Sequence, residues 1–66
     1  MHFVFLHGLD LEPYLLNLDV VDYITELPSG NTALYEKGKK TCFVCAESFA
    51  EVCRKIESVL EREVKI

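Results

Sequence analysis

Short runs of hydrophobic residues, each ended by turn-forming residues, divide most of the chain into predicted strands. Residues 2–6 (HFVFL) are aromatic and β-branched enough to favour a strand. Both faces of this strand would be apolar, so we expect it to be central in a sheet or at a subunit contact. The following His7–Gly8 pair predicts a tight turn, in which the glycine is able to take a positive φ.

The next segment predicts a second strand and then an ambiguous region. Residues 9–17 (LDLEPYLLN) begin with strand-like alternation, and Pro13, which has no amide hydrogen, makes the segment an edge strand or a bulge. In residues 18–27 apolar side chains recur every three positions, as in a helix, yet β-branched and aromatic residues are concentrated there, as in a strand. These β-formers favour a turn at residues 17–19 and a strand from about Val20.

Two further turn signals complete a meander. Residues 28–31 (PSGN) and 37–38 (KG) carry turn chemistry, and they bound strands predicted at residues 32–36 and 39–46. Because these hairpin signals lie close together along the chain, neighbouring strands should pair antiparallel.

A C-terminal helix has the clearest signal in the sequence. Ser48 and Glu51 have the S-x-x-E spacing of a capping box, in which the serine hydroxyl accepts from the Glu51 amide and the carboxylate reaches back to the Ser48 amide. One helix face is apolar: Phe49, Val52, Cys53, Ile56, Val59 and Leu60. The sequence therefore predicts a single α+β domain over residues 1–66, an antiparallel β-meander of about four to five strands with one C-terminal α-helix packed on it.

Composition narrows the classes of partner. With 66 residues of which 50% are hydrophobic, the chain has apolar surface to spare for self-association. Its net charge is −4 and no basic stripe stands out, which disfavours nucleic acid and anionic membranes and suits a basic protein partner. The first residues lack the basic and apolar regions of a signal peptide or membrane span, and an odd number of cysteines fits a reducing cytoplasm.

Cysteine chemistry is the first candidate activity. Cys42 and Cys45 form a C-x-x-C, but Phe43 and Val44 between them are not turn formers, so the two thiols should point to opposite strand faces. We therefore expect no metal site, and we interpret Cys45 and Cys53 as core residues. Cys45 lies just before the helix, where the helix dipole would lower the thiol pKa only if the side chain were exposed.

Other residues give little support for catalysis. Neither histidine is next to an obvious nucleophile, and the glycines are isolated at turns, so we expect no catalytic residue, no phosphate loop and no cofactor. The tyrosines suit either the rim of a meander or a protein interface. The candidate interaction surface consists of Tyr14, Asp19, Asp22, Tyr23, Glu26 and Tyr35.

The order of turn, cap and core residues resembles the small flagellar and swarming-motility proteins of the FlbD type. The matching residues are Gly8, Leu16, Asn17, Asp19, Val21, Ile24, Pro28, Thr32, Leu34, Gly38, Lys39, Val44, Glu47, Ser48, Val52 and Ile56. The resemblance covers nearly the whole chain, but Gly30–Asn31 and the residues after Lys40 are additions to the family pattern, which also lacks the cysteines. It implies a non-enzymatic accessory protein linked to motor power and swarming.

Three hypotheses on function follow. The first is a protein-interaction module that binds another protein, and also itself through its first strand or an exposed sheet edge. The second is an inhibitor, encoded by a phage or mobile element, that binds a host defence nuclease complex through an acidic surface. Concentration of Asp10, Glu12, Asp19, Asp22 and Glu26 on one face would favour this hypothesis, and an even spread would count against it. The third, a thiol or metal protein, is testable by zinc analysis and thiol titration.

Overall fold

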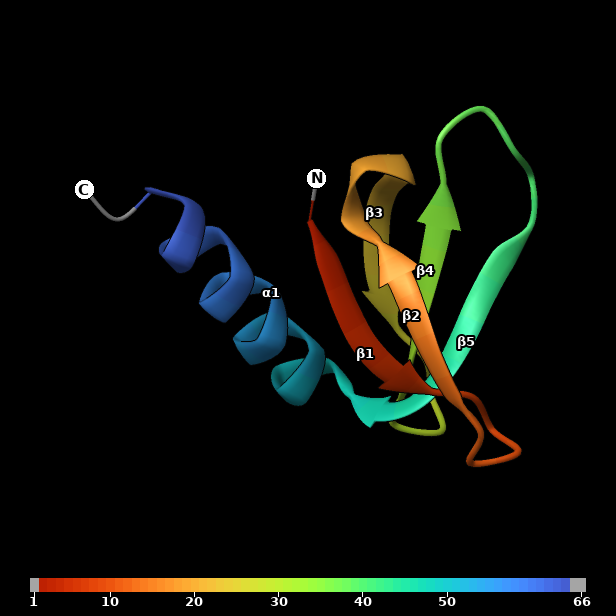
Figure 1. Ribbon diagram of the computed structural model, residues 1–66. Coiled ribbons are helices and arrows are strands. Elements are labelled where there is room, and N and C mark those ends of the chain that lie inside the picture. Colours follow the sequence, from red (N-terminus) through yellow and green to blue (C-terminus); the bar gives the residue numbers. More distant parts are fainter. Residues whose placement is uncertain (1, 65–66) are drawn as a thin grey trace.

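The predicted α+β fold is confirmed in the computed structural model, which describes residues 2–64 and their side chains as far as residue 61 (Figure 1). Its elements in chain order are β1 (Phe3–His7), β2 (Pro13–Asn17), the 3-10 turn η1 (Leu18–Val20), β3 (Val21–Glu26), β4 (Asn31–Glu36), β5 (Cys42–Ser48) and α1 (Phe49–Val64).

The strands form two antiparallel sheets rather than one. β1 pairs with β2, and β3, β4 and β5 form a three-stranded sheet in that order. A single bridge between Gly8 and Cys45 joins the end of β1 to β5. The helix begins directly after β5 and runs past β1 toward the N-terminal end of that strand (Figure 1).

The core lies between the two sheets and the first turns of the helix. Its buried members are Val4, Leu6, Leu34, Cys45 and Val52. In β1 the buried residues alternate with exposed Phe3 and Phe5, so one face of this strand points outward. The expectation that the first strand is central is therefore wrong, because β1 pairs with one strand and the other sheet covers only its inner face.

The connection between β1 and β2 is longer than predicted. Residues 8–12 form the loop, so the expected strand from residue 9 is wrong, although Pro13 does begin an edge strand. A two-residue hairpin with a type I′ turn needs a positive φ at both central positions. Here the positive φ belongs to Leu11, at 66°, and not to Gly8.

The connection between β4 and β5 is longer for the same reason. Gly38 has a φ of 73° and is the positive-φ residue of this turn. A two-residue turn of type I′ needs a positive φ at both central residues, and neither neighbour of Gly38 has one. Residues 39–41 therefore remain in the connection, and the last strand begins at Cys42 rather than at residue 39.

The ambiguous segment is a turn followed by a strand, as the β-formers predicted. Asn17 Oδ1 accepts a hydrogen bond from the Asp19 amide at 3.0 Å and starts the 3-10 turn η1. β3 then begins at Val21, one position after the expected start. The three-residue apolar repeat was misleading as a helix signal because the bulge between Val21 and Tyr23 lets Val21 and Ile24, three residues apart, both pack against the core.

The helix begins where the capping box predicted. Ser48 Oγ accepts from the Glu51 amide at 3.2 Å, while no returning bond from the Glu51 carboxylate is found within the described residues. Val52 is fully buried, and Ile56 packs against the same core one turn later. The apolar stripe thus places the helix, and the serine fixes its first turn.

The serine cap gives a direct test of the helix start. Ser48→Ala removes the acceptor and should lower the free energy of unfolding by about 1 kcal/mol, or roughly 4–8 °C in Tm. Ser48→Asp keeps an acceptor at this position and should stay close to the parent in thermal denaturation followed by circular dichroism. Equal melting curves for the alanine variant and the parent would contradict the assignment.

Candidate functional site

A groove of about 600 Å³ opens between the second half of α1 and β3. Its apolar lining comes from three elements that adjoin the core: Leu18, Val21, Ile24, Ile56 and Leu60. Leu60 is 45% exposed, and Figure 1 shows the C-terminal half of α1 standing away from the three-stranded sheet. The groove therefore presents an apolar floor to solvent.

Charged residues surround this floor. His2 Nδ1 lies 3.1 Å from Asp19 Oδ1, and this hydrogen bond holds the pKa of the Asp19 carboxyl below its ordinary value. Asp22 sits at a bulge in β3, where the pairing with β4 skips one residue, and Lys37 adds a positive charge to the rim. Bulges re-aim side chains, and this one adds a second carboxylate to the groove.

The structure brings together half of the predicted interaction surface. The groove is lined by three of its members, Asp19, Asp22 and Tyr23. Tyr35 joins them indirectly, because its ring stacks on that of Tyr23 with centroids 4.5 Å apart. Tyr14 lies elsewhere, with its ring edge against Phe43 at 5.2 Å, and Glu26 is exposed at the far end of β3.

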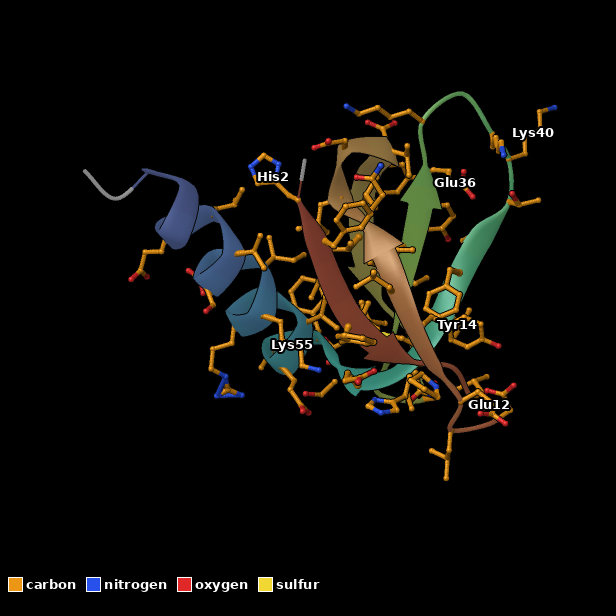
Figure 2. The ribbon with its side chains drawn as sticks, viewed as in Figure 1. His2, Glu12, Tyr14, Glu36, Lys40 and Lys55 are labelled. Carbon is orange, nitrogen blue, oxygen red and sulfur yellow. The ribbon has the colours of Figure 1, made fainter. Side chains whose placement is uncertain are left out.

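A buried carboxylate, which sequence reasoning gave no role, joins three elements at the opposite end of the core. Glu47 is 7% exposed and accepts from the His7 amide at 2.9 and 3.1 Å. Its Oε2 lies 2.7 Å from His7 Nδ1, so the imidazole is the donor, since an ionised carboxylate only accepts. Lys55 Nζ lies 3.5 Å from the same oxygen and donates to the Phe5 carbonyl at 2.9 Å (Figure 2).

These contacts determine the acidity of Glu47. Burial alone raises the pKa of a carboxyl group, but the hydrogen bonds from the His7 amide and ring, together with the Lys55 charge, outweigh burial and lower it to about 2. The group is therefore ionised at neutral pH. It also closes the free edge of β1, because Glu47 and Lys55 occupy the His7 amide and the Phe5 carbonyl.

A bulge in β5 turns Glu47 inward. The pairing passes from Thr32–Cys45 to Asn31–Ser48, so Glu47 has no partner on β4. Its carbonyl instead accepts from Thr32 Oγ1 at 3.1 Å. A signal was available in the sequence, because Glu47 is two residues after a predicted core cysteine and shares its strand face.

The cysteines diverge as the strand geometry predicted. Cys42 is exposed and Cys45 fully buried, with its thiol 3.7 Å from the Glu47 carbonyl. Burial raises the pKa of the Cys45 thiol, which opposes any activation by the helix dipole. In the part of the chain that the structure describes, no three His, Cys, Asp or Glu side chains are grouped so as to hold a metal ion.

The His7 ring and the groove differ in their surroundings. The one hydrogen-bond partner of the His7 ring within residues 2–61 is the Glu47 carboxylate, so no hydroxyl or thiol is placed there for activation. The groove, by contrast, combines apolar area with a charged rim, which is the usual composition of a recognition site.

Comparison with known proteins does not assign a family. No protein-family model matches the chain, and no match is found among the curated proteins or the solved structures. Within the described residues, no helix has both the length and the apolar character needed to cross a bilayer.

The low pKa of Glu47 predicts acid sensitivity. The pKa falls from 4.5 to about 2 on folding, which corresponds to about 3 kcal/mol of stability. This stability is fully present above about pH 5, and it is lost as the pH falls toward 2, because protonation then removes the charge in the folded state as well. Urea denaturation at a series of pH values between 7 and 2 measures it.

Two variants isolate this carboxylate. Glu47→Gln should flatten the decline in stability between pH 5 and 2, and should be less stable than the parent at pH 7. Glu57→Gln, which changes an exposed helix residue, should keep the parent profile. An unchanged acid slope in Glu47→Gln would show that other carboxyl groups cause the decline.

Thiol exposure predicts a graded reaction with a disulfide reagent. In the native protein Cys42 should react within minutes, and Cys45 should react only through unfolding, at a rate lower by at least about 10³-fold given ordinary domain stability. Mass spectrometry of labelled peptides separates the sites, and labelling in guanidinium provides the reference for full reaction. Rapid labelling of Cys45 in the native protein would contradict this prediction and support the hypothesis of a reactive thiol.

Proposed function

We propose that this chain is a non-enzymatic protein-binding module that receives an apolar, basic segment of a partner protein in the groove between α1 and β3. The observation that carries the proposal is the groove itself, with Ile56 and Leu60 on one wall and Asp19 and Asp22 at its edge. Apolar anchors would fill the floor, while lysine or arginine side chains of the partner would meet the two carboxylates.

The resemblance to FlbD-type proteins suggests which cellular process the binding module would serve. In that setting the partner belongs to the flagellar motor or its basal body, and the module acts as a motility accessory in the cytoplasm. Of the groove residues, Asp19, Val21, Ile24 and Ile56 are also among the residues that carry the resemblance. The proposal therefore places the family-like residues at the binding surface.

The inhibitor hypothesis receives less support from the arrangement of acidic residues. Asp10 and Glu12 lie in the loop after β1, whereas Asp19 pairs with His2 at the start of that strand. Figure 2 shows His2 and Glu12 at opposite ends of the β1–β2 hairpin. A single acidic face able to occupy a nucleic-acid groove is thus not formed by these residues.

Self-association would use the outer face of the β1–β2 hairpin rather than the free edge of β1. Glu47 and Lys55 occupy the β1 edge at His7 and Phe5. The outer face of the β1–β2 hairpin exposes Phe3, Phe5 and Leu15, and this is the apolar surface on which a second copy would pack.

Matched variants test the groove. Leu60→Gln keeps a good helix former but removes the apolar contact, and Asp22→Lys reverses a rim charge; each should weaken partner binding at least about tenfold. The assay is retention of partners by the tagged chain from host cells, quantified by mass spectrometry, with the affinity for the recovered partner then measured on purified proteins.

Two control variants make the result specific. Glu26→Lys reverses a charge on the same strand outside the groove, and Leu15→Gln removes an exposed leucine from the hairpin face. Both should retain the partner, while size-exclusion chromatography of Leu15→Gln reports separately on self-association. A partner lost equally from all four variants, or from none, would overturn the groove as the binding site. Recovery of motor proteins supports the motility setting, and recovery of a nuclease complex supports the inhibitor.

A further inference from the structure

The loop between β1 and β2 holds two leucines out in water. Leu9 is 60% exposed and Leu11 is 72% exposed, the highest value among the large hydrophobic residues described. The loop projects from the end of the hairpin that lies away from His2 and the groove (Figures 1 and 2). These leucines therefore contribute little to the core.

The backbone of this loop is fixed and strained. Leu11 has a φ of 66°, a region that residues other than glycine, asparagine and aspartate rarely occupy. Two backbone bonds close the loop, from the Gly8 amide to the Glu12 carbonyl at 3.0 Å and from the Leu11 amide to the Gly8 carbonyl at 2.8 Å. An exposed apolar residue in such a conformation costs free energy twice, through its exposure to water and through its backbone strain.

Side chains reinforce the same geometry. Asp10 accepts from the Glu12 amide at 3.0 Å and from the Tyr14 hydroxyl at 3.3 Å. A Cβ on Gly8 would lie 2.7 Å from the Tyr14 ring and 2.8 Å from Asp10, so a larger residue there would have to displace one or both of these side chains. The leucines are thus presented by a preorganised loop, which lowers the entropic cost of binding.

We infer that this loop is a second docking element, whose Leu9 and Leu11 insert into an apolar pocket, rimmed by lysine or arginine, on a partner protein. The carboxylates of Asp10 and Glu12 flank the leucines and would meet the basic rim. The same charges disfavour an anionic membrane, and they disfavour the groove of a second copy, which carries Asp19 and Asp22. This inference goes beyond the groove and does not depend on it.

Photocrosslinking tests the loop in the full chain. A benzophenone amino acid replaces Leu9, and crosslinked proteins are recovered from host cells and identified by mass spectrometry. We expect a partner whose yield falls at least about tenfold in Leu11→Asn and falls in Glu12→Lys, but is retained in Glu57→Lys. With the recovered partner purified, the same order should hold for the dissociation constants.

Stability separates a docking role from a structural one. Asparagine tolerates the left-handed conformation, so Leu11→Asn should have a Tm equal to that of the parent or up to about 5 °C higher. A lower Tm would mean that Leu11 supports the fold, and would overturn the inference. Three crosslinking results would also overturn the inference: crosslinks unaffected by Leu11→Asn, crosslinks only between copies of this chain, or no crosslink at all. Leu11-dependent cosedimentation with vesicles of phosphatidylcholine and phosphatidylserine would overturn it as well, because the loop would then bind a membrane.

Discussion

The buried carboxylate of Glu47 is the interaction on which the arrangement of this small domain depends. A carboxylate with 7% exposure is costly to bury without partners, and here the partners come from two other elements, the His7 end of β1 and Lys55 of α1. The same group therefore ties the hairpin to the second sheet and to the helix. Lys55 extends the link by holding the Phe5 carbonyl, so a charged pair occupies an edge that would otherwise be free to pair.

The groove is a consequence of how this network orients the helix. Ser48 fixes the first turn immediately after the bulge that turns Glu47 inward, and Val52 then fills the core. A helix anchored at its N-terminal half must carry its later apolar residues past the edge of the sheet. Ile56 and Leu60 consequently face β3 across an open space, with η1 and the β3 bulge supplying the acidic rim.

The elements were predictable from local sequence because each is specified by local chemistry: the serine cap, the PSGN turn and the β-formers after Asn17. The loop lengths were not predictable from the sequence. A glycine shows where a positive φ is possible, but it does not show which residue of the loop adopts one, and in the loop after β1 that residue is Leu11, which disfavours this conformation. The site was half predictable. Asp19, Asp22 and Tyr23 are neighbours in sequence and stay together. The distance to Tyr14 is set by how the two sheets pack, whereas Glu26 lies at the other end of β3.

The distribution of apolar residues argues that folding is not the only constraint on this chain. Six hydrophobic residues are buried among the residues that the structure describes, a small core for a domain whose size already makes it marginal. Burying one more leucine would add about 1.5–3 kcal/mol. Yet Leu9, Leu11 and Leu60 remain in water, one of them in a strained conformation and the others beside carboxylates. Apolar side chains left exposed at a cost in stability are expected where a binding partner buries them.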